Sequence, residues 1–218
     1  YSHENKLKDF ADGKYDILLG TQMVAKGLDF ENVTLVGVIN ADQQLNNDDF
    51  RSQERTFDLL TQVVGRAGRG QYKGTAVIQT CNPENDVIQI AARQDYDAFF
   101  KDELKTRKML IYPPYCDICL IGFIGENEPK VRVASQKYTD RLKEKLSGEY
   151  KDLKIIALGP MTARVSKISN KFRYRLILKC KNTKRFRALM NELLKYTGTD
   201  RAYNDVSVYI DINPENII

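Results

Sequence analysis

The sequence has no apolar run long enough to cross a membrane and contains only four cysteines in 218 residues. A membrane-spanning helix needs about 20 mostly apolar residues, so we expect no membrane span. A charged segment followed by an apolar one is also missing, which argues against a secretory signal peptide. Few cysteines and no export signal favour a reducing cytosol. Because the chain begins at Tyr1 and not at Met, we expect it to be a piece of a longer protein.

The cysteines do not form a convincing metal site. Cys116 and Cys119 have the close spacing of metal ligands, but Cys81 and Cys180 stand alone and a second close pair is missing. A structural zinc ion takes about four ligands. We therefore expect no metal to be bound by this chain.

Positive charge is concentrated in one part of the chain. The whole sequence carries a net charge of +5, whereas Lys130 to Met190 holds 18 Lys and Arg against 4 Asp and Glu. Arg164 to Arg187 holds ten basic residues and no acidic one, with Phe172 and Tyr174 between them. Such a stretch is typical of a surface that binds nucleic-acid phosphates. A basic face that serves only solubility is the alternative.

The first half of the chain alternates between strand-like and helix-like segments. That alternation predicts a parallel sheet covered by helices, as in an α/β domain. We expect strands at Ile17–Leu19 (buried), Val33–Ile39 and Thr75–Thr80, a loop at Ala41–Asp49, a helix at Arg51–Arg69, and one or two helices in Asn85–Met109.

Pro113 and Pro114 stop any helix, and we place a domain boundary there, giving domains 1–112 and 113–218. Beyond it the pattern β-α-β-β-α-β predicts the ferredoxin-like split unit. Arg164–Lys171 would be the hairpin or long loop between its second and third strands, projecting basic side chains. The expected elements are strands Asp117–Gly125, Leu153–Leu158, Arg173–Cys180 and Val206–Ile212, and helices Glu128–Leu146 and Thr183–Tyr196.

The helix expected at Arg51–Arg69 carries side chains suited to binding phosphate. At about 100° per residue, Gln62, Arg66 and Arg69 share one stripe, and the opposite stripe is apolar, formed by Phe57, Leu60, Val64 and Ala67. Guanidinium groups match phosphate oxygens and can stabilise a transferring γ-phosphoryl group. Gly65 and Gly68 destabilise a helix, so something should need the space that they leave. A solvated amphipathic helix is the alternative.

The segment Gly20 to Phe30 follows the first expected strand, where ligands of open α/β sheets bind. Thr21 offers a hydroxyl and a backbone N–H to a nucleic-acid phosphate, and Lys26 adds a charge. Gly27 permits close backbone approach, and Asp29 could hold a metal-bound water or a ribose hydroxyl. An ordinary strand-to-helix turn is the alternative.

Together these two segments resemble the second motor lobe of superfamily 2 helicases. The resemblance to the primosomal protein N′ family of bacterial replication-restart helicases is closer and covers nearly the whole chain. It is carried by Ile17–Phe30, Val33–Gln44, Asp49–Arg69, Tyr96–Phe99, Pro113–Tyr115, Leu158–Pro160 and Asp211–Pro214.

The resemblance implies a fold and a set of roles. The fold would be an incomplete RecA-like second helicase lobe followed by a smaller ferredoxin-like α+β domain that binds branched DNA. The activity would be ATP- and Mg²⁺-dependent 3′→5′ unwinding in the bacterial cytoplasm, at the nucleoid. The implied partners are forked and single-stranded DNA, the single-stranded-DNA-binding protein, other primosome proteins and the loader of the replicative helicase.

The same resemblance assigns individual residues. Arg66 and Arg69 would act as γ-phosphate sensors and arginine fingers beside Gln62. The remaining implied positions are Gly27, Asp29 and Gly65 at the ATP cleft, and Thr21, Gln22 and Lys26, which would touch the translocating strand or couple it to the cleft. The charge of the basic stretch, and not the resemblance, assigns DNA binding to Arg164, Lys167, Lys171, Arg173 and Arg175.

The chain departs from the family in what it lacks. It contains no Gly-x-x-x-x-Gly-Lys-[Ser/Thr] loop, since Gly13 and Lys14 stand without the rest, and no magnesium-binding acidic pair at a strand end. Those parts and the family's Zn²⁺-binding insertion would lie upstream, so we expect this chain alone to be inactive. A non-catalytic nucleic-acid-binding module is the alternative. Lys184, Arg185 and Arg187 at a helix start could instead dock an acidic protein tail.

Overall fold

The computed structural model describes residues 2–21, 30, 32–65, 67 and 73–217. The chain divides into two compact units. Unit 1 comprises Tyr1–Asn47 and Arg51–Glu103, and unit 2 comprises Asp48–Phe50 and Leu104–Ile218. The domain boundary expected at Pro113 lies beyond this division and stays a prediction. No helix in the described part of the chain is both long and apolar enough to span a membrane.

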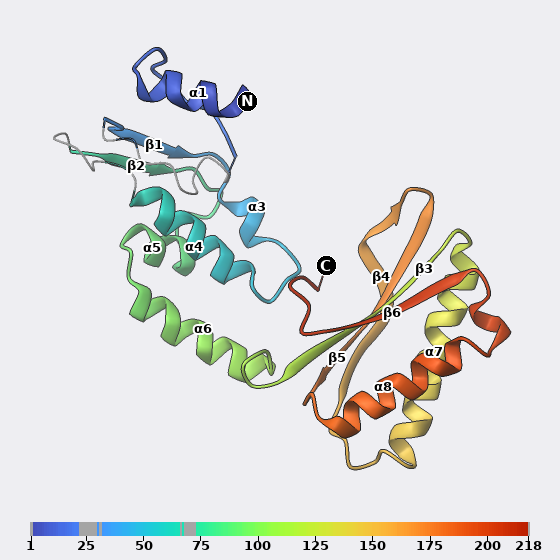
Figure 1. Cartoon of the computed structure of the whole chain (residues 1–218). Helices are drawn as coiled ribbons and strands as arrows, with labels where there is room; N and C mark the ends of the chain where they lie inside the picture. The colour runs from blue at the N-terminus through green and yellow to red at the C-terminus, as the bar shows by residue number, and fades with distance from the viewer. Residues whose placement is uncertain (1, 22–29, 31, 66, 68–72, 218) are drawn as a thin grey trace. The chain divides into compact units, whose positions relative to one another are not determined.

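Unit 1 contains a short parallel sheet and several helices (Figure 1). Its two strands pair from Leu35↔Thr75 to Val38↔Ile78. The elements are α1 (Ser2–Ala11), β1 (Leu35–Val38), α3 (Asp42–Leu45), α4 (Ser52–Val64), β2 (Thr75–Ile78), α5 (Asp86–Ala92) and the beginning of α6 (Tyr96–Leu110). The alternation of strands and helices is therefore present, as the sequence predicts.

The core of unit 1 lies where α4 packs against α5. Phe57 and Leu60 are buried on the inner stripe of α4, and the Phe57 ring stacks on Phe99 with 4.2 Å between ring centroids. Asn85 caps α5, because its side-chain oxygen accepts a hydrogen bond from the Val87 backbone N–H at 3.0 Å. The buried stripe fixes which face of α4 remains in solvent.

Two expectations for segments of unit 1 outside α4 were wrong. Ile17–Leu19 is not a strand, and Ile17 and Leu19 are 84% and 83% exposed. Apolar character alone does not make a strand, because the backbone needs a neighbour to pair with, and in the described residues this segment has none. The expected loop Ala41–Asp49 contains helix α3, whose first residue, Asp42, accepts hydrogen bonds from the Thr80 hydroxyl and the Cys81 N–H.

Unit 2 contains a four-stranded sheet with the strand order β4-β5-β3-β6. Every neighbouring pair in this sheet is antiparallel. Helices α7 and α8 lie together on one face of the sheet (Figure 1). The elements are β3 (Asp117–Gly125), α7 (Glu128–Ser147), β4 (Ile156–Ile168), β5 (Lys171–Cys180), α8 (Lys184–Thr197), the short 3₁₀ helix η1 (Arg201–Tyr203) and β6 (Val206–Ile212). Their β-α-β-β-α-β order is the predicted one.

Local capping explains where the helices of unit 2 begin. The Asn127 side chain accepts from the Lys130 N–H at 3.0 Å before α7, and Pro129 occupies its first turn. Thr183 accepts from the Phe186 N–H at 3.1 Å before α8. These caps set helix starts within one residue of those predicted.

The segment between β4 and β5 is the hairpin, the first of the two alternatives predicted from the sequence. Arg164–Lys171 is not a long loop, because β4 continues to Ile168 and β5 begins at Lys171. Ser169 and Asn170 form the whole connection, with φ values of 48° and 61°. Two residues with positive φ are typical of the tight turns whose twist matches a β-hairpin. β4 also begins at Ile156, later than the expected Leu153.

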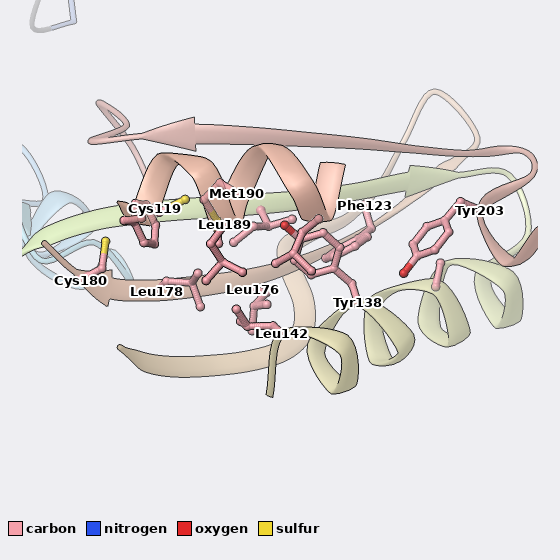
Figure 2. Packing of buried hydrophobic residues seen from close by; sticks show 14 of the residues in the cluster. Cys119, Phe123, Tyr138, Leu142, Leu176, Leu178, Cys180, Leu189, Met190 and Tyr203 are labelled. Atoms are coloured by element: carbon pink, nitrogen blue, oxygen red, sulfur yellow. The ribbon is translucent and has the colours of Figure 1, made fainter. Parts of the chain in front are cut away.

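The core of unit 2 lies between the sheet and the two helices (Figure 2). Phe123 of β3 meets Tyr138 of α7 edge to face, with 5.5 Å between ring centroids. Cys119 and Cys180 are buried in the same core, and burial raises the pKa of each thiol to about 12. Thiols held neutral in this way are poor metal ligands and nucleophiles. In the described residues, no group of three or more His, Cys, Asp or Glu side chains could hold a metal ion.

Asn213 fastens the end of β6 to the start of β3. Its side chain accepts from the Ile118 N–H at 3.0 Å and donates to the Asp117 carboxylate at 2.9 Å, with its backbone φ at 54°. We expect Asn213→Ala to lower the free energy of unfolding by about 1–2 kcal/mol, because it loses both bonds and the side chain that tolerates this conformation. Urea unfolding measures the change.

Asn213→Gly serves as the matched control, because glycine accepts the positive φ and loses only the side-chain bonds. Its loss of stability should be smaller than that of Asn213→Ala. An unchanged urea midpoint for Asn213→Ala would show that this junction does not hold the sheet together.

Candidate functional site

The C-terminal end of α4 carries the described part of the first candidate site. Val63 is buried and Gln62 is exposed, so the amide of Gln62 is available to a ligand. Helix α4 ends at Val64, and not at Arg69 as predicted, because Gly65 caps it with its N–H donating to the Thr61 carbonyl at 3.0 Å. Glycine is a common residue at helix ends. A Cβ on Gly65 would lie 3.2 Å from the Thr61 carbonyl oxygen, so this position is crowded as well.

The other residues of this candidate site are mostly outside the described part of the chain. Arg66, Arg69, Gln22, Lys26, Gly27 and Asp29 all lie there. Thr21 is described and exposed at the start of the second motif. The proposed ATP-cleft roles therefore stay predictions. The donor set of amide and guanidinium groups fits an anionic phosphate ligand by its chemistry.

The basic stretch forms the second candidate site, on the β4–β5 hairpin. Arg164, Lys167 and Lys171 are exposed, whereas Arg173 and Arg175 are half-buried on β5. The Lys167 ammonium lies 4.6 Å from the centre of the Phe172 ring, which holds it by a cation–π contact. The hairpin thus presents cations along both of its strands.

A bulge in β4 moves Arg164 out of the regular ladder. Thr162 pairs with Tyr174 and Lys167 pairs with Phe172, so β4 advances further than β5 between these two pairs. The extra residues of β4 between Thr162 and Lys167 cannot all pair with β5. A bulge of this kind bends an edge strand and redirects its side chains.

Two cations of the basic stretch are used inside unit 2. The Lys179 ammonium donates to the Leu110 carbonyl at 2.6 Å and lies 3.6 Å from the centre of the Tyr112 ring. Burial lowers the pKa of Lys179. Arg185 donates to the Asp152 carboxylate at 2.9 Å and lies over the Tyr150 ring. The basic surface is therefore smaller than the sequence alone suggests.

Arg175 is only partly available to a ligand, because it is half-buried and contacts the C-terminal segment. One of its guanidinium nitrogens donates to the Ile217 carbonyl, while its Nε is buried and, in the described structure, has no hydrogen-bond partner. Arg175 thus anchors the C-terminal segment, in addition to the DNA-binding role predicted from the sequence. Lys184 and Arg187 are exposed at the start of α8, and Arg187 donates to the Asn182 side chain at 3.3 Å.

Sequence reasoning missed one pair of residues on the sheet. Gly122 of β3 pairs with Tyr209 of β6, and the Tyr209 ring lies across the glycine. A glycine inside a strand often marks a site where another group approaches the backbone closely. Gly122 was therefore the signal in the sequence that could have indicated such a contact. The identity of the approaching residue depends on strand order and could not be read from the sequence.

Comparisons with known proteins match both halves of the chain. The family model described as Primosomal protein N C-terminal domain matches residues 108–215, and the model described as Helicase conserved C-terminal domain matches residues 2–71. Replication restart protein PriA of Bacillus subtilis (strain 168) is 41% identical over 98% of this chain. The chain belongs to the PriA family.

Other PriA proteins are similar to this chain as well. Replication restart protein PriA of Synechocystis is 42% identical over 82% of the chain, and that of Borreliella burgdorferi is 37% identical over 98% of it. The chain spans only 21–31% of the length of these relatives. Together with the two family models, this similarity supports its assignment as a C-terminal part of PriA.

A solved structure, De novo designed protein Foldit4, aligns with 46% of this chain and 98% of its own. The TM-score is 0.32 and the sequence identity is 12%. At these values the alignment says nothing about function.

Proposed function

We propose that this chain is the C-terminal part of an ATP-dependent 3′→5′ DNA helicase that recognises stalled or branched replication forks and restarts replication. The observation that carries the proposal is the pair of motifs Gly20–Phe30 and Gln62–Arg69 within one PriA-family sequence. The helicase model spans both motifs, because it matches residues 2–71. The similarity to PriA over nearly the whole chain supports the same conclusion.

Unit 1 would be the C-terminal portion of a RecA-like second motor lobe. The parallel pairing of β1 with β2 and the packing of α4 against α5 support this. Unit 2 would be a ferredoxin-like DNA-binding domain. Its support is the antiparallel order β4-β5-β3-β6 with both helices on one face, because in a split β-α-β unit a third strand lies between the two that the helix connects.

In the proposed motor, this chain supplies the second half of the ATP site. Arg66 and Arg69 would place guanidinium groups on the γ-phosphate, and the exposed amide of Gln62 would lie beside them. Gly27, Asp29 and Gly65 would line the same cleft. The P-loop lysine and the acidic group that holds Mg²⁺ would come from the upstream lobe, as would the Zn²⁺-binding insertion, because the sequence lacks them.

DNA would contact both units. Thr21, Gln22 and Lys26 would hold the translocating strand, and the exposed cations of the β4–β5 hairpin would hold forked DNA through its phosphates. The single-stranded-DNA-binding protein, other primosome proteins and the helicase loader complete the proposed set of partners. The proposed location is the bacterial cytoplasm, at the nucleoid.

Because this chain would supply only half of the ATP site, the half-site, we expect it to be inactive on its own. We expect the 218-residue chain to show no DNA-stimulated ATP hydrolysis, whereas the full-length gene product hydrolyses ATP on a forked substrate. Turnover by the chain alone, above that of its Arg69→Ala variant, would contradict the half-site. A full-length product without ATPase would instead favour a non-catalytic nucleic-acid-binding module, which the basic hairpin alone could support.

A further inference from the structure

The sheet of unit 2 has an outer face that α7 and α8 do not cover. Side chains alternate across a strand, and Cys119, Ile121 and Phe123 of β3 point into the helical core. Gly122 and Ile124 therefore lie on the outer face, together with the residues that pair with them. Those partners are Arg175 and Arg173 on β5, and Tyr209 and Ser207 on β6.

Half of this outer face is covered by the rest of unit 2. Ile118, Leu120 and Ile177 are buried there in a small cluster with Ile217, and Tyr112 packs against the cluster. The other half, around Gly122 and Ile124, has no such apolar cover in the described residues. We call this uncovered part, around Gly122 and Ile124, the open half; it is the part of the sheet available to a partner.

Tyr209 is fixed in the middle of the open half. Its ring lies so close over Gly122 that a Cβ on the glycine would be 2.1 Å from the Tyr209 Cε1 atom. The residue is nevertheless 37% exposed. An aromatic ring held against a glycine on one side and open to solvent is a pre-ordered surface for stacking.

Cations and a hollow adjoin this ring. Arg175 is the β5 partner of Gly122, Arg173 is the β5 partner of Ile124, and Lys171 follows at the hairpin end. A hollow of about 660 Å³ lies at this end of the sheet, lined by Ile124, Ser207 and Lys171 together with Lys130 and the acids Glu126 and Asp205. Asp211 is the exposed acid next to Tyr209 on this face, toward its covered half.

We propose that the open half of this face binds single-stranded nucleic acid, with a base stacked on Tyr209 and the neighbouring phosphates on Arg173 and Lys171. The proposal rests on the proposed function, since it names the part of unit 2 that takes the unpaired strand. Stacked aromatic rings flanked by cations are the usual chemistry of single-strand binding, and paired bases cannot expose a free face to such a ring. Gly122 would be a positioning residue that keeps the ring in place.

The test compares two oligonucleotides that carry the same charge. Fluorescence anisotropy would measure binding of the 218-residue chain to a short oligothymidylate and to the same backbone with abasic sugars. Loss of stacking should weaken binding of the abasic strand roughly 5- to 150-fold. Tyr209→Ala should bind both strands with the weaker affinity, and Tyr209→Phe should behave as wild type because it retains the ring.

Two further variants test whether the position of the Tyr209 ring, and not any exposed tyrosine, determines binding. Gly122→Ala should reproduce the Tyr209→Ala loss, because the added methyl group displaces the ring. Tyr115→Ala removes another exposed tyrosine of unit 2 and should change nothing. Thermal unfolding identifies any variant that fails to fold, and Tyr209→Phe against Tyr209→Ala then decides the question.

The outcomes separate this inference from the proposed function. Binding that is equal for normal and abasic strands, or unchanged in Tyr209→Ala, would overturn the stacking surface while DNA binding by unit 2 stands. An equal loss by Tyr209→Ala on duplex DNA would overturn it as well. No binding to any of these nucleic acids would overturn the DNA-binding role of unit 2 itself.

Discussion

Replacing Arg69 with alanine in the full-length gene product should lower DNA-stimulated ATP turnover by about 10³- to 10⁵-fold, the range seen for arginine fingers. The reason is that a guanidinium placed on the γ-phosphate stabilises charge that develops only in the transition state. Arg66→Ala should have an effect of the same order if both arginines act there. Steady-state hydrolysis on a forked substrate measures the change.

DNA affinity provides the internal comparison for this experiment. It should remain nearly that of wild type, because neither arginine belongs to the basic hairpin. Arg93→Ala, which removes an exposed arginine at the end of α5 in the same unit, is the matched control and should keep full turnover. If Arg69→Ala retained turnover within a few-fold of wild type, the finger assignment would be wrong.

Replacing Arg164, Lys167, Lys171 and Arg173 together with glutamine should produce the opposite pattern. Each cation that neutralises a phosphate of single-stranded DNA contributes about 0.7 to the slope of log K against log salt. Removing four should flatten that slope by about 3 and weaken binding roughly 10²- to 10³-fold at 0.1 M salt. Titrations of a forked oligonucleotide at several salt concentrations measure both quantities.

The control for this variant removes the same charge from another surface. Lys101, Lys105 and Lys108 on α6 and Lys195 on α8 are exposed, and their replacement with glutamine should leave most of the slope intact. Arg175 is omitted from the set because it anchors the Ile217 carbonyl. Equal losses in both variants would mean that general charge, and not the hairpin, determines DNA affinity.

Local sequence patterns predicted the elements of unit 2 well. β3 and β6 have the predicted bounds, and Thr183 caps α8 at the residue that began the predicted helix. Apolar runs, caps and turns are local signals, and here the packed fold agrees with them. The helix of unit 1 was predicted too long because Gly65 was taken as a helical residue, whereas it ends α4.

What the sequence could not provide were relations between distant segments. Ile17–Leu19 has the composition of a strand, yet strand formation depends on a pairing partner elsewhere in the chain. The basic stretch looked uniform, but Lys179 and Arg185 are held by Leu110 and Asp152, far away in sequence. The contact of Tyr209 with Gly122 likewise requires β6 to lie beside β3.

The edges of the two sheets have different consequences for aggregation. In unit 2, edge strand β4 contains Pro160, which has no N–H, and irregular pairing after Thr162, so another chain finds little continuous backbone to extend. In the described part of unit 1, β1 and β2 pair only with each other, and Leu35 and Val77 are exposed. Unprotected apolar strands of this kind can template pairing between copies. Among the described residues, β1 and β2 are thus the strands most open to such pairing, together with β6, the regular second edge of the unit 2 sheet.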